Sequence, residues 1–403
     1  MKNLLTSLTI VMLLVLSACK EQSRPTKHKE GKTWYKGNLH THSFWSDGYE
    51  FPKPILHWYK SNNYQFIALS DHNTIAMEEK WIPVRSDSLF QKSYNNYLTT
   101  YGEEWVETKK DSTNTLVRLK TYEEYRKLFE KEGEFLVIQS EEITDRFEDK
   151  HVHINATNIQ EKIDPQGGNS VLETMQNNLD QILRQRQETG VPIMPHINHP
   201  NFFYSITLED MIALEGEQFF EVYNGHPMVH NLGDSLHIST EEMWDLINIS
   251  YIANNKPLMY GLATDDSHNY HRKGQKWSNA GRGWVMVQAD TLSAPSLIQA
   301  MEKGDFYAST GVTLASLDHS DDALTIAVAA EPGVGYTISF IGCLKGETET
   351  RELLSVDAAK ARFKFPKDLL FVRAKITSDK RQENPIENMK YELAWTQPIL
   401  KAP

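Results

Sequence analysis

Several short apolar runs in this chain lead directly into histidine or carboxylate residues, and this repeated pattern most constrains its fold. Runs at 66–69, 135–138 and 257–260 are each followed within a few residues by imidazole or carboxyl groups. Longer amphipathic segments separate several of these runs, as in α/β proteins with a largely parallel sheet. Polar groups at strand ends meet at one edge of such a sheet, where a site can form.

The expected elements follow from the spacing of apolar residues. Strands are expected at 66–69, 135–138, 191–194, 219–222 and 257–260, and helices at 121–132, 171–188 and 240–254. Residues 76–120 are polar and aromatic and predict an excursion over one end of the domain. After about residue 311, short alternating runs at 324–328, 336–340 and 371–376 predict a small β-rich module, a β-sandwich by preference.

The polar groups that follow the runs are metal-compatible. His40 and His42 are two residues apart, so in an extended segment both imidazoles face one side. The further candidates are Asp47, His72, Glu141 or Glu142, His151 or His153, His196 or His199, Asp266 and His268. A lone instance of any of these is more readily explained as a structural residue, such as an N-cap aspartate. Six such segments together are hard to explain by packing, because these groups are costly to bury without a partner.

The chain resembles the PHP (polymerase and histidinol phosphatase) family of metal-dependent hydrolases. The resemblance is carried from about residue 38 to residue 268 by short motifs: His40-Thr41-His42, Ser46-Asp47-Gly48, Ser70-Asp71-His72-Asn73-Thr74, Glu142-Ile143-Thr144, His199-Pro200 and Asp266-Ser267-His268. It implies a distorted (β/α)7 TIM-like barrel with up to three metal ions at its mouth.

The resemblance also implies a role for each ligand. His40, His42, Glu142 and Asp266 would hold one ion. Glu142 would bridge to a second ion, completed by His153 and His199, and Asp47, His72 and His268 would hold the third. The family pattern favours Glu142 over Glu141 and His153 over His151.

Mixed imidazole and carboxylate ligands suit Zn, Mn or Fe better than Ca or Mg, without ranking the three. Bound water can then lose a proton near neutral pH, which predicts hydrolysis by a metal-bound hydroxide. We expect a phosphoesterase, with a phosphomonoester favoured. The β-rich tail and residues 219–226 look like extracellular PHP proteins, including the carbaryl-hydrolase-like branch, so a carbamate or carboxylester hydrolase is the alternative. A non-catalytic binding lipoprotein is the second alternative.

Two residues are candidates for roles in the reaction itself. Asp71, beside His72, is expected to orient that imidazole or to pass a proton, or else to be an ordinary turn aspartate. Arg282, between two glycines, is expected to clamp an anionic substrate through its guanidinium. Further candidates for contact with a small anionic substrate are Asn224, His226, His271 and Arg272.

The N-terminus predicts the cellular address. Lys2 and an apolar run lead to Leu16-Ser17-Ala18-Cys19, which predicts a lipoprotein signal peptide over 1–18, with an uncleaved anchor as the alternative. Lipidation of Cys19 and a flexible tether over 19–33 would place the protein in the cell envelope, anchored to a membrane. The expected domains are a metallohydrolase domain over 34–312 and a β-rich domain over 313–403. A net charge of −12 argues against a nucleic-acid polymer as partner, and the oligomeric state stays open.

Overall fold

A computed structural model describes residues 31–401 of this mixed α/β protein. The expected signal peptide, Cys19 and all but the last three residues of the expected tether lie outside the described residues. Within the described part of the chain, no helix is both long and apolar enough to cross a membrane.

Seven strands of the N-terminal two thirds form one continuous hydrogen-bonded path, in the order β10-β9-β8-β7-β6-β2-β1. Their bounds are β1 Thr33–Asn38, β2 Phe66–Leu69, β6 Leu136–Phe147, β7 Lys150–Thr157, β8 Met194–Ile197, β9 Phe219–Asn224 and β10 Tyr260–Thr264. Neighbours are parallel except at β7, which is antiparallel to both β6 and β8. No strand ladder joins β10 to β1 among the described residues, but an isolated parallel bridge links Thr41 to Ser267 just beyond the two strands.

Helices join several of these strands: α1 Pro52–Ser61, α3 Tyr122–Phe129, α4 Val171–Thr189, α5 Leu208–Ala213, α6 Thr240–Ala253 and α7 Ala294–Glu302. The longest, α4, shows why they form where they do. Ser170 caps its first turn by accepting a hydrogen bond from the Glu173 amide, and Gly190 ends it in the left-handed conformation at φ 68°. Met175, Leu179 and Ile182 recur at helical spacing and are fully buried.

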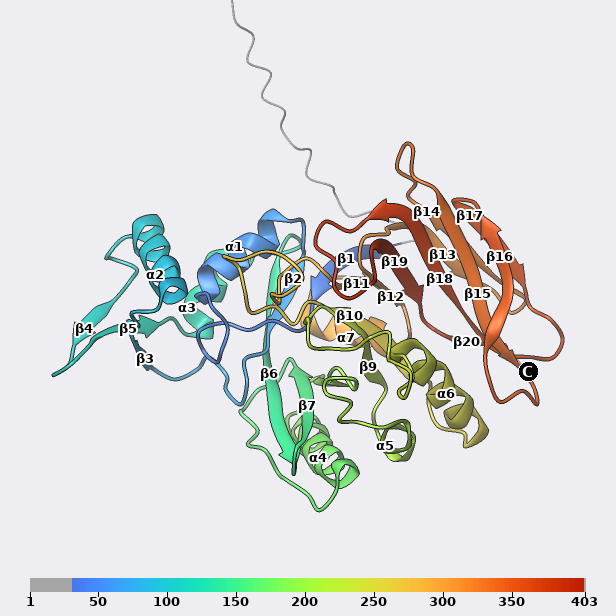
Figure 1. The fold of residues 1–403 in the computed structure, drawn as a ribbon, viewed down its shortest axis with the longest axis horizontal. Coiled ribbons are helices and arrows are strands. Elements are labelled where there is room, and N and C mark those ends of the chain that lie inside the picture. Colours follow the sequence, from blue (N-terminus) through green and yellow to red (C-terminus); the bar gives the residue numbers. More distant parts are fainter. Residues whose placement is uncertain (1–30, 402–403) are drawn as a thin grey trace, which may run out of the picture.

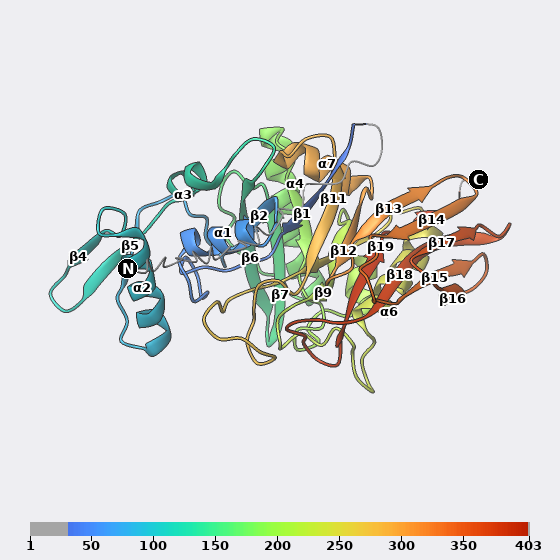
Figure 2. The same cartoon turned by 90° about the horizontal axis from the view of Figure 1, so that it is seen from above.

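Residues 76–120 form the expected excursion. They contain β3 (Lys80–Pro83), α2 (Ser88–Tyr101), β4 (Thr108–Lys110) and β5 (Thr115–Leu119), and the strands pair as a separate sheet in the order β3-β5-β4. Figure 1 shows this excursion and the C-terminal strands at opposite ends of the molecule, and Figure 2 shows the same separation from above.

The C-terminal strands continue the main sheet across the expected domain boundary. β11 (Trp284–Ala289) and β12 (Phe306–Ser309) connect β1 to β19 (Tyr391–Thr396), and the path continues through β18 (Leu369–Arg381), β15 (Tyr336–Leu344) and β16 (Arg351–Asp357); β20 (Ile399–Leu400) pairs with β18. A second sheet of β13 (Leu314–His319), β14 (Ala323–Val328) and β17 (Lys360–Lys364) shares an apolar core with these strands. Two packed layers therefore make up this part.

The C-terminal strands are also fixed to α6 by a buried ion pair. Arg373, 1% exposed, donates from Nε and a terminal nitrogen to the two carboxylate oxygens of Asp245, at 2.7 and 2.9 Å. Thr350 Oγ1 donates to the same carboxylate at 2.7 Å. The bidentate geometry fixes both distance and orientation between the helix and the sheet.

Two expected strands are displaced along the sequence. The run 191–194 only reaches β8 at its last residue, and the run 257–260 only reaches β10 at its last residue. Pro257 cannot donate a backbone hydrogen bond to a ladder, which is consistent with the later start of β10.

Candidate metal centre

The predicted ligands converge from six strands of the main sheet, β1, β2, β6, β7, β8 and β10, or from the residues that follow them. His40 and His42 follow β1, His72 follows β2, His199 follows β8, and Asp266 and His268 follow β10. Glu142 and His153 instead lie within the antiparallel pair β6 and β7. The loops are tied together by backbone hydrogen bonds from the Asp266 amide to the His40 carbonyl and from the His42 amide to the Ser267 carbonyl, both 3.0 Å.

Four ligand atoms from His40, His42, Glu142 and Asp266 form the tightest group. His40 Nε2 lies 3.1 Å from His42 Nε2, 3.3 Å from Glu142 Oε2 and 3.4 Å from Asp266 Oδ1. His42 Nε2 lies 3.2 Å from each of the same two carboxylate oxygens. Four ligands placed tetrahedrally at zinc-like distances stand about 3.3–3.4 Å apart. The distances from the two imidazole nitrogens to each other and to both carboxylate oxygens are close to this separation.

The Glu142 carboxylate faces two groups of imidazoles at once. Its Oε2 faces His40 and His42 and also lies 2.9 Å from His72 Nδ1 without a hydrogen bond between them, whereas its Oε1 lies 3.0 Å from His153 Nδ1 and 3.6 Å from His199 Nε2. Glu142 is fully buried, yet Oε2 has no hydrogen-bond partner, and neither has either ring nitrogen of His153. Buried polar atoms without partners are costly, and a bound cation would satisfy them.

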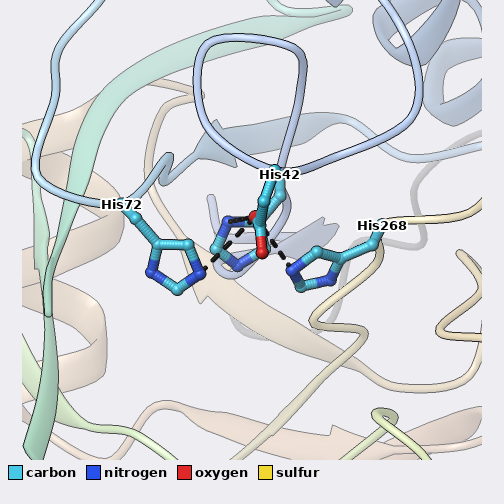
Figure 3. A group of neighbouring side chains, drawn as sticks. His42, His72 and His268 are labelled. Carbon is cyan, nitrogen blue, oxygen red and sulfur yellow. Dashed lines mark ion pairs between the residues drawn. The ribbon is translucent and has the colours of Figure 1, made fainter. Parts of the chain in front are cut away.

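A third group surrounds the Asp47 carboxylate. Asp47 Oδ1 lies 3.2 Å from His268 Nε2, 3.5 Å from His72 Nε2 and 3.8 Å from His42 Nδ1. Figure 3 shows these three imidazoles turned toward one another. The Asp47 side chain is 58% exposed and that of His72 is 25% exposed, so this is the side from which solvent reaches the cluster.

The described residues thus bring all nine predicted ligands into a continuous set of groups that could hold metal ions. His42 also joins the Asp47 group, which the sequence did not predict. Which ion each residue would hold, and how many ions bind, stay predictions.

The electrostatics favour ionised carboxylates. Burial opposes ionisation of Glu142, but the imidazoles of His72, His40 and His153 hold its pKa well below the usual range. Burial lowers the pKa of His72, but the carboxylates of Glu142 and Asp47 outweigh it and raise that pKa to about 9. Burial lowers the pKa of His153 to about 4. An imidazole must be neutral to bind a metal, so His153 is ready for ligation at neutral pH.

Glu221, in the middle of β9, supports the cluster and was missed by the sequence reasoning. Its Oε1 accepts from His40 Nδ1 at 2.7 Å and from Thr264 Oγ1 at 2.7 Å. Its Oε2 accepts from the His199 amide and from Asn224 Nδ2, both at 2.8 Å. Because the carboxylate holds the proton on His40 Nδ1, Nε2 is left free to bind a metal. The sequence did contain a signal for this role, namely a glutamate inside the apolar run 219–224.

Two more ligands are oriented from outside the cluster. His268 Nδ1 lies 3.0 Å from the Asp266 carbonyl, which leaves its Nε2 to face Asp47. His72 Nδ1 lies 2.5 Å from Thr144 Oγ1. Asn224, expected to touch substrate, instead donates to Asp266 Oδ2 at 3.1 Å as well as to Glu221.

The expected role of Asp71 needs correction. Its Oδ1 accepts from the Ser43 and Ser46 amides at 2.8 and 3.1 Å and from Ser46 Oγ at 2.6 Å, and its Oδ2 accepts from Ser43 Oγ at 2.7 Å. The carboxylate therefore holds the loop between His42 and Asp47, and the hydrogen bonds it makes do not go to the His72 ring. Asp71 positions the metal-ligand loop as a turn aspartate would.

The expected role of Arg282 also needs correction. Its guanidinium is buried and donates to the carbonyls of Asn384, Gly225, Trp277 and Gly274 and to Asn384 Oδ1, at 2.6–3.2 Å. All five N–H groups of an arginine are used in this way. Arg282 therefore holds loops together and has no donor left for an anionic substrate.

The remaining candidates lie in different surroundings. His271 Nε2 lies 2.7 Å from the buried carboxylate of Glu50, and the Arg272 guanidinium lies over the Trp277 ring at 4.7 Å. The His226 ring is next to that of His268, with centroids 5.5 Å apart. The Met228 amide donates to His226 Nδ1 at 3.2 Å, so a neutral His226 carries its proton on Nε2.

The alternatives to the chosen ligands face elsewhere. Glu141 Oε2 accepts from the Ile163 amide at 2.9 Å, and burial raises the pKa of this side chain to about 7. The His151 ring stacks against Phe203, with centroids 5.6 Å apart. His196 is buried, and its Nε2 lies 3.6 Å from Glu221 Oε1, which makes a further metal-compatible group with His40.

Comparison with protein-family models finds no match, and comparison with curated proteins finds none either. Solved structures give low-scoring matches. One is a two-domain Bacteroides vulgatus protein containing a predicted PHP-like metal-dependent phosphoesterase, with TM-score 0.42, 13% identity, and coverage of 94% of this chain and 99% of that one.

Two further matches cover less of the chain. One is a structure from Bifidobacterium adolescentis described as a metal-dependent phosphoesterase, with TM-score 0.28, 10% identity, and 60% and 92% of the two chains covered. The other is an amidohydrolase from Chromobacterium violaceum, with TM-score 0.28, 11% identity, and 67% and 96% covered. Similarities at this level carry no argument about activity, so the function has to be argued from the residues of the site.

Proposed function

We propose that this protein is a metal-dependent hydrolase, with a phosphomonoester as the favoured substrate, and that up to three Zn, Mn or Fe ions bind at the cluster. The observation that carries the proposal is the Glu142 carboxylate, whose two oxygens face separate imidazole groups and whose Oε2 is buried without a hydrogen-bond partner. A carboxylate so placed is suited to bridge two cations. We further propose that the seven strands from β1 to β10 named above form the distorted PHP-type barrel.

The ligand assignment in the proposal is the one that the family resemblance implies. His40, His42, Glu142 and Asp266 would hold one ion, Glu142 with His153 and His199 a second, and Asp47 with His72 and His268 a third. When bound, such ions act as Lewis acids and lower the pKa of coordinated water toward neutrality.

The protein's own residues supply orientation. Glu221 keeps the proton of His40 on Nδ1, and the Asp266 carbonyl does the same for His268, so that both Nε2 atoms remain available. Asp71 holds the loop that carries Asp47. A neutral His226, protonated on Nε2, offers a hydrogen-bond donor beside His268.

A carbamate or carboxylester hydrolase on the same ions is the second candidate. Arg282, the residue expected to clamp an anion, spends all its donors on protein oxygens. The negative charge of a phosphate would therefore have to be met by the ions and by imidazole N–H groups. An uncharged ester or carbamate needs fewer positively charged or donor groups around it, and this favours the second candidate.

The envelope address is retained as a proposal from the sequence alone: signal-peptide removal before Cys19, lipidation of its thiol, and anchoring to a membrane. Replacing Cys19 with serine should abolish lipid incorporation and release the protein from the membrane fraction. Continued membrane association without lipid would instead indicate the uncleaved anchor.

Metal counting combined with a substrate panel tests the function. The purified chain should hold at least two ions after equilibration with Zn or Mn, and it should hydrolyse phosphomonoesters faster than phosphodiesters, aryl esters or aryl carbamates. Turnover of aryl carbamates or esters alone would select the second candidate. Fewer than two ions per chain would exclude the multinuclear site, and bound metal with no turnover at all would leave a binding protein.

A further inference from the structure

Phe202, Phe203 and Met228 lie beside the predicted metal ligands without being buried. Phe203 is 50% exposed and Met228 44% exposed, and Phe202 is half-buried. An isolated antiparallel bridge pairs Phe202 with Val229, so the loops that carry Phe203 and Met228 lie side by side. Grouped apolar side chains of this kind on a surface commonly mark a binding site.

This apolar group is continuous with the metal centre. The Phe202 ring has its centroid 5.0 Å from that of His199 and 6.1 Å from that of His153. The Phe203 ring centroid is 4.6 Å from that of Phe202 and 5.6 Å from that of His151, on which Phe203 stacks with an interplanar angle of 30°. A planar group lying on these rings would therefore be next to the predicted ligands.

The backbone at Phe203 adopts a strained conformation, which contacts of the neighbouring Tyr204 hold in place. Phe203 and Tyr204 have φ values of 51° and 49°, in the left-handed region that bulky residues seldom occupy. The Tyr204 ring stacks on His237, with centroids 3.7 Å apart and an interplanar angle of 8°, and also on His230 at 5.1 Å. Strain that the fold maintains near a site is a pointer to function.

We propose that Phe202, Phe203 and Met228 form an aromatic subsite that receives a planar aromatic leaving group of the substrate. The inference rests on the proposed ester hydrolysis and names its substrate class, the esters of aromatic alcohols. Within this subsite, the organic part of the substrate would be recognised by the ring faces of Phe202 and Phe203 and by the polarisable thioether of Met228. The three residues are called the aromatic subsite below.

Binding of non-hydrolysable phosphonates tests the subsite independently of turnover. Calorimetry on the metal-loaded full chain would compare benzylphosphonate, cyclohexylmethylphosphonate and methylphosphonate. We expect benzylphosphonate to bind about tenfold tighter than methylphosphonate and tighter than its non-planar analogue. Phe203→Ala should remove this preference, and Phe203→Leu should keep the apolar part but lose the distinction between planar and non-planar rings.

Leu236→Ala is the matched control, because Leu236 is an 86% exposed apolar side chain on the same surface segment as Met228. It should leave the three affinities unchanged. Equal affinities for all three phosphonates, or an unchanged preference in Phe203→Ala, would overturn the subsite. Loss of vesicle binding in Phe203→Ala with the phosphonate preference intact would also overturn it, by assigning these side chains to a membrane surface.

Turnover of benzyl phosphate and ethyl phosphate separates this inference from the proposed function. Hydrolysis of neither, together with the expected phosphonate preference, would support the subsite and count against the phosphoesterase. Hydrolysis of both with equal kcat/KM, together with equal phosphonate affinities, would support the phosphoesterase and refute the subsite.

Discussion

Replacing Glu142 with glutamine should remove the charge that the two imidazole groups share while keeping the shape of the side chain. Oε2 stands 3.2–3.3 Å from the Nε2 atoms of His40 and His42, and Oε1 stands 3.0 Å from His153 Nδ1. The amide supplies only one acceptor and places an NH2 group where the second oxygen stood. Loss of one partner from a buried charged group costs about 3–5 kcal/mol. At about 1.4 kcal/mol per tenfold change, metal affinity should fall by about 10²–10⁴.

Glu141→Gln is the matched control for this experiment. The neighbouring side chain points to the other face of β6 and accepts from the Ile163 amide, so its replacement should change metal affinity less than threefold, a threshold of about 0.6 kcal/mol. Competition with a chelator would give the Zn and Mn affinities of both variants, and circular dichroism would show that both are folded. Wild-type affinity in Glu142→Gln would refute the bridge, and a large loss confined to Glu141→Gln would show that the other carboxylate is the ligand.

Three further predictions concern residues outside the ligand set. Glu221→Gln should weaken metal binding by about 10–100-fold and redistribute the His40 tautomers, as seen by ¹⁵N NMR. Burial raises the pKa of Glu217 from 4.5 to about 8. The wild-type free energy of unfolding should therefore fall as pH rises between these values, by roughly 1.4 kcal/mol per pH unit. Glu217→Gln should make that fall shallower in urea titrations of the metal-free protein by the share of Glu217, leaving the share of Glu141, whose pKa is raised to about 7; an unchanged pH profile would contradict the assignment. Asp245→Asn should destabilise the protein by about 1–3 kcal/mol in urea unfolding, because it removes the bidentate charged partner of the buried Arg373 guanidinium and leaves only the Glu241 carboxylate, 3.4 Å from a terminal nitrogen; unchanged stability would refute this.

Most of the nine candidate ligands could be picked out from the sequence because their signal is local. A run of apolar residues that leads into His72 or Asp266 indicates both where a strand ends and which polar group lies at its end. The choice between Glu141 and Glu142 depended on a family resemblance, since strand alternation says that the two differ without saying which one faces inward. Two of the metal-compatible groups that the structure brings together contain Glu142, whereas Glu141 accepts a hydrogen bond from a backbone amide.

The roles of Asp71 and Arg282 could not be predicted in this way, because their partners are distant in sequence. Arg282 bonds to Asn384, 102 residues further along the chain, and Asp71 bonds to a loop 25–28 residues earlier. The hydrogen-bond partners of a buried charged side chain are set by which oxygens or amides the fold brings near it. The residues next to Arg282 in the sequence do not indicate these partners. The main sheet shows the same limit, since nothing in the local pattern near residue 312 reveals that the strands on either side of it pair.

Strand β9 holds several candidate ligands in position before any metal ion binds. This strand contributes no predicted ligand, yet the Glu221 carboxylate accepts from a ring nitrogen of His40, the amide of His199 and the hydroxyl of Thr264. Those three donors belong to the segments that carry ligands from β1, β8 and β10. One buried carboxylate thus fixes the relative positions of three ligand segments and the protonation of one imidazole before any cation arrives. The side chains then need little rearrangement when a metal ion binds. Such a prepared site is what orienting a reacting group requires, and it is more than metal binding alone requires.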